Sequence, residues 1–537
     1  MSDRRGRGMR FRIGVAAAAL IWALVWLGVG WSYMLDDALI HLRYAHNLLS
    51  DHTSTFNRDG FSIGCSSPLY LWILAAGSLV TDSLWLPKAV SVAAYAGLLG
   101  LIVWQWLRAA APVGWLWGAL LIACCGPAAD RWLANGMETS LTMLLAMLAA
   151  LATPSLVVAP EGTAAGDAQP LAAGRKVARY LWLCLLGFLL VASRVEAALL
   201  ILAASLFLVI WRGSAPPGSA SLAGRLRAFA GAAVEHSHLA VGGLAALATI
   251  WLEFGAFVSD AGLAKQSGPQ SIGAAIWAIL WPTATSMTFG LGLLAVWLVS
   301  LAMCGLLWPG RRVAVLAANV ALPLLALGVA RTGQGVVGVR YVAWLYLFQA
   351  AFNLELARLA PEAARQALAT RVGRRAPLAL AGLAAVVWAG ATVYESRRIE
   401  LVIRADGGRL VDMAADDLSA LSRQKGIAYD VGFIGYLTDG VILDMNGLIN
   451  GREVSRLSLE ERARRFAAES PQFVFLTPDQ VDHLAQWFDL RDFLVWRVYE
   501  LPGTRYYLGA RRSLVEEKHL AGATTPILEA VESRRRG

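Results

Sequence analysis

Two adjacent carboxylates follow an uncharged apolar run near the N-terminus. The run covers 13–35, Asp36 and Asp37 come directly after it, and Arg43 follows seven residues after the first of them. Because neighbouring carboxylates repel each other, either one of them has a raised pKa or the pair attracts a cation. The first outcome suits a general base that deprotonates a hydroxyl group, and the second suits Mg²⁺ or Mn²⁺ bound together with a phosphate.

A simpler alternative is that the two aspartates cap a helix and complement its dipole. Capping explains one carboxylate well, but it explains neither the second carboxylate nor a cation on the same helix face. In a helix over 36–49, leucines share one stripe and Asp37, His41 and Tyr44 share another. This pattern predicts a helix that lies flat on the membrane surface, with its acidic N-terminus directed at the interior of a bundle.

The composition is that of a membrane protein. Of the 537 residues, 57% are hydrophobic and only 16% are charged. The hydrophobic residues form blocks of about 17 to 22 residues, long enough to cross about 30 Å of hydrocarbon. The basic residues behind the net charge of +9 gather in short loops between these blocks, which indicates a positive-inside bias and no nucleic-acid partner.

Arginine-rich segments set the expected orientation. Five arginines precede the first apolar block, so the N-terminus is expected in the cytoplasm and the block stays as an anchor. The basic loop 371–375 is also expected inside, which makes 376–393 the last span. Counts from the two ends agree if 67–82 is an interfacial or half-inserted helix, and 270–284 looks similar. The expected total is about 11 to 13 transmembrane helices.

In this topology, nearly every polar group that interrupts the apolar blocks falls on the outer side. Charges at or near bilayer depth are costly, and such residues are functional candidates by default. Their gathering on one face predicts a single site at the outer membrane surface. The residues are Asp36, Asp37, Arg43, Glu138, Arg194, Glu196, Asp260, Lys265, Arg331 and Arg340.

The cations and carboxylates of this face suggest how a substrate is held. Arg340, expected at a helix N-terminus, forms a natural phosphate clamp with Lys265 and Arg43. Alternatively, each of these cations contacts lipid headgroups. Four other members of the group are expected to bind the substrate, although helix capping and a structural ion pair are open alternatives. They are Glu138, Arg194, Glu196 and Asp260.

The chain is expected to divide after residue 393. Residues 1–393 would form the transmembrane module, with the first outer loop over 35–66, and 394–537 would form a soluble domain outside the cytoplasm. The fold class is therefore a polytopic all-α membrane protein with a small C-terminal α/β extracytoplasmic domain. Within that domain, 425–448 has the pattern of strand, short helix and strand, 458–469 that of an amphipathic helix and 471–477 that of a strand. A hairpin is expected over 493–512, with a frayed tail after it.

Several stretches carry a family resemblance. "LDDALIHLRYAHNLL", "NGMETSL", "SRVEA", "GLAK" and "GVRY" occur in this order, and "VGFIGYLTDGVILDMNGLIN" follows in the C-terminal domain. Together they resemble the membrane glycosyltransferases of the GT-C superfold, nearest to the terminal β-(1→2)-arabinofuranosyltransferase family and its bacterial relatives. The resemblance implies a polyprenyl-phosphate sugar donor, with arabinofuranose as a candidate sugar, and a site that faces away from the cytoplasm. It also implies a catalytic aspartate in the first outer loop, which maps to the Asp36–Asp37 pair.

Two functional classes remain at this stage. A glycosyltransferase of the plasma (inner) membrane would transfer sugar from the lipid carrier to a cell-envelope glycan, lipid or protein. Nucleotide sugars stay in the cytoplasm, so an outer site needs a lipid-carried donor. A transporter or a lipid or glycolipid flippase would instead place polar residues at the bilayer midplane and would show an inverted repeat. The one-sided charges and the lack of a visible repeat favour the enzyme.

Overall fold

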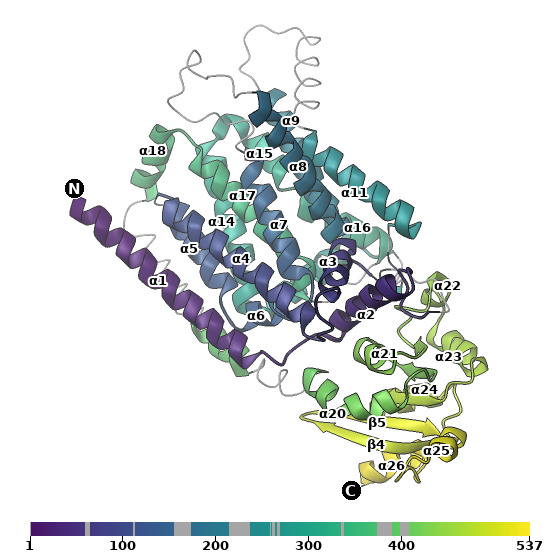
Figure 1. Cartoon of the computed structure of the whole chain (residues 1–537). Helices are drawn as coiled ribbons and strands as arrows, with labels where there is room; N and C mark the ends of the chain where they lie inside the picture. Colours follow the sequence, from purple (N-terminus) through teal and green to yellow (C-terminus); the bar gives the residue numbers. More distant parts are fainter. Residues whose placement is uncertain are drawn as a thin grey trace.

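The computed structural model shows a bundle of helices with a small sheet domain at one end (Figure 1). The structure describes residues 2–58, 65–110, 113–154, 173–213, 338–372, 389–397 and 407–536, and 237–333 without 258, 260–261, 263 and 266–268. The expected fold class, a mostly helical membrane protein with a small C-terminal α/β domain, is confirmed.

Four helical stretches of the described chain are long and apolar enough to cross a membrane. Two are single helices: Gly8–Val29 within α1 (Ser2–Val29), and α4 (Leu86–Arg108). The third joins the π-helix η3 (Met287–Leu291) to α14 (Gly292–Leu307). The fourth runs over Pro309–Thr332 and contains η4 (Pro309–Arg311), α15 (Arg312–Ala318) and α16 (Ala321–Thr332).

One expected span is broken. The apolar block 112–128 forms α5 (Val113–Cys124) and α6 (Pro127–Leu133), which meet at an angle of 72°. Pro127 cannot donate the next helical hydrogen bond and starts a new helix. Whether this bent pair crosses the membrane, as the sequence predicts for 112–128, stays a prediction. The expected last span, 376–393, lies mostly outside the described residues.

The remaining apolar helices are shorter. The 11 residues of α3 extend about 16 Å, roughly half of the hydrocarbon thickness, as expected for a half-inserted helix. α17 is buried along almost its whole length, where it packs against α7 and α14. The shorter helices are α3 (Pro68–Ser78), α7 (Thr139–Ala152), α8 (Ala173–Ser193), η2 (Val195–Ala197), α9 (Ala198–Gly213), α11 (His238–Phe254), α13 (Ile272–Thr285), η5 (Val339–Tyr341), α17 (Ala343–Arg358) and α18 (Glu362–Val372).

The C-terminal domain contains a five-stranded sheet of order β2-β1-β3-β5-β4. β1 (Gly426–Ala428) pairs in parallel with β2 (Ile442–Asp444) and β3 (Phe473–Leu476), and β5 (Thr504–Arg511) is antiparallel to β3 and to β4 (Phe493–Leu501). The predicted strands, helix and hairpin are confirmed. The expectation of a frayed tail was wrong, because α26 buries Ile527 and Val531 against the sheet. The helices are α20 (Gly407–Ala420), α21 (Gly432–Thr438), α22 (Arg452–Ser455), α23 (Leu459–Ala468), α24 (Pro478–Ala485), α25 (Arg512–Lys518) and α26 (Ile527–Arg536).

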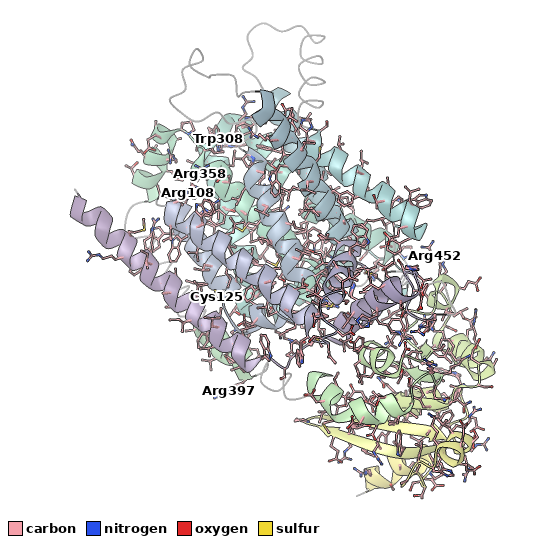
Figure 2. All side chains as sticks on the ribbon, in the orientation of Figure 1. Arg108, Cys125, Trp308, Arg358, Arg397 and Arg452 are labelled. Carbon is pink, nitrogen blue, oxygen red and sulfur yellow. The ribbon has the colours of Figure 1, made fainter. Side chains whose placement is uncertain are left out.

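The sheet domain is docked on the segment that follows α1. α2 (Asp36–Ser50) packs against α21, and Asn57 binds the edge strand β2 as another strand would. The Asn57 side chain donates to the Ile442 carbonyl and accepts from the Ile442 amide, both at 2.9 Å. Figure 2 places Arg108 and Arg358 toward the other end of the bundle, and Arg397 at the end nearer the sheet domain. The segment that carries α2 and Asn57 therefore lies between the helical bundle and β2.

Candidate functional site

An open cavity lies where the N-terminus of α2 meets the ends of several bundle helices and the sheet domain, with a volume of about 70 Å³ for water-sized molecules. It contains most of the residues that the sequence singled out, although they are up to 300 positions apart in the chain. Its walls are formed by Asp37, Ile40, His41, Ser66, Met137, Glu138, Arg194, Glu196, Ser259, Gly262, Lys265, Arg340, Tyr341, Leu448 and Ile449.

The central contact of the cavity joins α2 to η5. Arg340 Nη2 donates to Asp37 Oδ2 at 2.7 Å, and the Arg340 side chain is only 9% exposed. η5 begins after Gly338, whose φ of 84° suits glycine and whose missing side chain leaves room for Trp132. Burial alone would raise the pKa of Asp37, but Arg340 and then Lys265 outweigh it and lower that pKa below its ordinary value. Asp37 is therefore held as a carboxylate.

Tyr341 brings three cations together. The charged groups of Arg194, Arg340 and Lys265 lie 4.7, 5.1 and 5.8 Å from the centre of its ring. Its hydroxyl accepts from Arg340 Nη2 at 3.3 Å and from Lys265 Nζ at 3.4 Å. Burial would raise the pKa of Tyr341, yet the cations, Arg340 first, lower it overall. The concentrated positive charge attracts anions.

Glu138 and Glu196 lie on either side of the charge of Arg194 as its ion-pair partners. Arg194 Nη1 lies 3.6 Å from Glu138 Oε1, and Arg194 Nε lies 3.8 Å from Glu196 Oε2. These are ion pairs without hydrogen bonds. Four buried atoms have no hydrogen-bond partner within the described part of the chain: Arg194 Nε and Nη1, Arg340 Nη1 and Glu138 Oε2. Buried polar groups are normally hydrogen-bonded, so unpaired guanidinium donors in a cavity indicate a ligand that would complete them.

Asp36 has a different environment from its neighbour. Its two carboxylate oxygens accept from the backbone amides of Gly432 and Phe433, each at 2.8 Å, at the start of α21. Gly432 allows this approach, because a side chain there would clash with the backbone of Asp36. Burial, followed by the charge of Asp430, raises the pKa of Asp36 to about 8. Asp36 thus binds the sheet domain and is not part of the cavity wall.

Arg43 was expected in the phosphate clamp, and the structure places it elsewhere. Its Nε donates to the Phe56 carbonyl at 2.8 Å and its Nη2 to the Gly440 carbonyl at 2.6 Å, with the side chain buried. It shares a helix face with Asp36, as the sequence indicated, but that face meets the sheet domain. Arg43 makes its hydrogen bonds with backbone carbonyls, its Nη1 has no partner among the described residues, and it does not line the cavity.

The other expected residues are distributed as follows. Glu138, Arg194, Glu196, Lys265 and Arg340 line the cavity with Asp37. Arg331, which the sequence placed on the same face, is exposed at the end of α16. Asp260 lies outside the described residues.

Sequence reasoning missed Tyr341, Leu448 and Ile449 as members of the site. Tyr341 could have been found beside Arg340 in "GVRY", because a tyrosine next to a cation in a polar loop is an obvious partner for it. The two apolar residues gave no signal of their own, since they reach the site only through the docking of the sheet domain.

Whether the adjacent aspartates bind Mg²⁺ or Mn²⁺ together with a phosphate stays a prediction. The described residues contain no group of three or more His, Cys, Asp and Glu side chains that could hold a metal ion. Asp36 is engaged by two backbone amides and Asp37 by Arg340. The two carboxylates therefore have different partners.

Comparisons with known proteins identify the fold. The chain matches no protein-family profile and no curated protein. ArnT from Cupriavidus metallidurans in the apo state is similar in structure, with a TM-score of 0.55, 13% sequence identity and coverage of 95% of this chain and 99% of that one. ArnT bound to undecaprenyl phosphate gives a TM-score of 0.51 at 12% identity, covering 96% and 99%. The apo oligosaccharyltransferase of Archaeoglobus fulgidus gives 0.47 at 11% identity, covering 96% and 75%. The chain has the GT-C fold, and these comparisons do not confirm the resemblance to arabinofuranosyltransferases.

Proposed function

We propose that this chain is a membrane glycosyltransferase that moves a sugar from a polyprenyl-phosphate donor to an acceptor hydroxyl. The observation that carries the proposal is the cluster of buried cations with unpaired donors beside one ionised carboxylate. A phosphate at the membrane surface is the anion that such a cluster fits. The GT-C fold supports the same conclusion, since ArnT, which shares it, was solved bound to undecaprenyl phosphate.

The donor phosphate would be bound by Arg340, Lys265 and Arg194. Arg194 takes the place that sequence reasoning gave to Arg43, because its guanidinium has free donors in the cavity. Positive charge at this position also stabilises the negative charge that develops on the phosphate as it leaves. The isoprenyl chain of the donor would extend into the bilayer around the bundle.

Asp37 would act as the catalytic base. Its lowered pKa keeps it ionised, and it lies in the cavity next to the cations. In the reaction, the acceptor oxygen forms a bond to the anomeric carbon, the bond from that carbon to the phosphate oxygen breaks, and the acceptor proton moves to Asp37. Glu138 and Glu196 are placed to accept hydrogen bonds from sugar hydroxyls.

We also propose the membrane orientation. The N-terminus and the end of the bundle that carries Arg108 and Arg358 would face the cytoplasm, and the cavity and sheet domain the opposite side (Figure 2). The acceptor would then be a cell-envelope glycan, lipid or protein. Arabinofuranose is the sugar that the sequence motifs favour.

Transfer in reconstituted vesicles tests the proposal. The full chain is supplied with undecaprenyl phosphate that carries radiolabelled arabinofuranose or other sugars, with a cell-envelope extract as acceptor, in the presence and absence of EDTA. We expect release of undecaprenyl phosphate and label in the acceptor, both lost in Arg340→Ala and kept in Arg331→Ala, whose cation is exposed at a helix end. Movement of intact donor between leaflets without cleavage would instead identify a flippase.

A further inference from the structure

One wall of the cavity comes from the sheet domain. Leu448 and Ile449 line it together with the charged residues of the bundle, and they belong to a loop over 445–450 that follows β2. We call this segment the roof loop. An apolar wall contributed by the domain that covers the membrane module gives the cavity two chemically different sides.

A buried carboxylate organises the roof loop. Asp444, at the end of β2, is fully buried, and its two oxygens accept from the backbone amides of Asn446 at 2.7 Å and Leu448 at 2.5 Å. Asn450 closes the loop, because its Oδ1 accepts from the Asp444 amide at 2.6 Å and its Nδ2 donates to the Ile442 carbonyl at 2.7 Å. Both ends of the loop are therefore tied to the same strand.

Two further contacts fix the loop. Gly447 has a φ of 75°, and any side chain there would press on the guanidinium of Arg462, 2.6 Å from the position of a Cβ. Arg462 in turn donates to the Met445 carbonyl at 2.9 Å. Because Asn57 also holds β2 against the first outer loop, the roof loop is positioned relative to α2 and Asp37 before any substrate arrives.

We propose that the roof loop binds a carbohydrate acceptor and keeps water from Asp37, and that Asp444 is the positioning residue for this loop. The inference rests on the proposed function. An acceptor enters from the side of the sheet domain, where Leu448 and Ile449 offer an apolar surface to the C–H face of a sugar ring. The base cannot by itself distinguish an acceptor hydroxyl from water, so selectivity needs a wall that holds one and excludes the other.

The chemical consequence is a partition between two products. When the acceptor is in place, its oxygen bonds to the anomeric carbon and a glycoside forms. When the apolar surface of the roof loop is lost, a water oxygen bonds to the same carbon and the bond from that carbon to the phosphate oxygen breaks. Free sugar is then released, and the proton of the water moves to Asp37. The ratio of free sugar to glycoside therefore reports how well the roof loop holds the acceptor and excludes water.

The experiment compares the Leu448→Ala/Ile449→Ala double variant and Asp444→Asn with wild type in vesicles. We expect an acceptor KM raised about tenfold or more, an unchanged donor KM, and a larger share of donor lost to free sugar. Binding of undecaprenyl phosphate alone should be unchanged in each variant. If Asp444→Asn does not fold, the double variant leaves the hydrogen bonds of Asp444 in place and carries the test.

Asp417→Asn is the matched control. Asp417 is a carboxylate of the same domain, and it accepts from Arg497 Nε at 3.1 Å and Tyr499 Oη at 2.7 Å, apart from the cavity. Its loss should leave the partition unchanged. A wild-type protein that cleaves no lipid-linked sugar would overturn the proposed function. The proposed function would stand, but the proposed role of the roof loop would be overturned, by the following result. The wild type cleaves lipid-linked sugar normally, and the roof-loop variants fold and keep the wild-type ratio of free sugar to glycoside and the wild-type acceptor KM.

Discussion

The contact between Arg340 and Asp37 yields a prediction about pH. In Arg340→Gln, the side chain keeps a polar end but loses its charge, so the burial that raises the pKa of Asp37 is opposed mainly by Lys265. The pKa of Asp37 should therefore rise. Because Asp37 must be ionised to accept a proton, the acidic limb of the activity profile should move to higher pH.

The size of the shift follows from the geometry. Two unit charges about 4 Å apart interact by about 4 kcal/mol at an effective dielectric constant of about 20, and this pair is closer, at 2.7 Å. Asp37 keeps 36% of its side chain exposed, so water screens part of the attraction. After this discount and the desolvation of Arg340, about 2 kcal/mol is a reasonable net value. Since one pKa unit corresponds to about 1.36 kcal/mol, the limb should move by about 1.5 units.

The assay is kcat/KM for the lipid-linked donor as a function of pH, which reports the free enzyme. The maximum value of kcat/KM should also fall, because Arg340 is expected to bind the donor phosphate. The pH at which the acidic limb of the profile lies is therefore the diagnostic quantity. Arg340→Lys should restore most of the wild-type position, and Arg331→Ala should leave it in place. A limb that does not move in Arg340→Gln, at any amplitude, would refute the assignment of Asp37 as the base.

Further predictions concern the two faces of α2 and the membrane orientation. Asp37→Asn should abolish sugar transfer in vesicles, whereas Asp36→Asn should retain it; the reverse result would exchange their roles. Because the pKa of Asp36 is raised from 3.8 to about 8, its contribution to stability falls as pH rises between these values, so Asp36→Asn should flatten the pH dependence of Tm in that window. Arg43→Ala should lower the free energy of unfolding by about 3 kcal/mol and leave the donor KM unchanged; an altered donor KM would return Arg43 to the phosphate site. A single cysteine placed within 512–537 should react with an impermeant thiol reagent in intact cells, after replacement of Cys65, and labelling only after lysis would invert the proposed orientation.

The sequence predicted the parts of this molecule that depend on local patterns. Alternating apolar residues and glycine-rich turns identified β1, α21 and β2, because period and turn chemistry are local properties. Charges inside apolar blocks identified Glu138 and Arg340, because such residues are costly unless they share a polar site. These signals need no knowledge of which helices are neighbours.

The parts that the sequence did not predict depend on tertiary contacts. The break after α5 depends on Pro127, whose effect can be a kink or a stop according to its surroundings. The position of Arg43 could not be foreseen, because a buried cation satisfies itself equally well with a phosphate or with backbone carbonyls such as that of Gly440. The helices of the tail form because the sheet offers an apolar face to Ile527, which no local pattern reveals.

The adjacent aspartates of α2 divide two tasks between them. Successive side chains of a helix point about 100° apart, so Asp37 can face the charged cavity while Asp36 binds the amides at the start of α21. The same short helix therefore holds the proposed base and the sheet domain that supplies the roof loop. Because both contacts are made from neighbouring residues, a displacement of the sheet domain would also displace Asp37. Each member of the carboxylate pair at the mouth of the membrane helix therefore has its own partner: Asp36 the amides of α21, and Asp37 the guanidinium of Arg340.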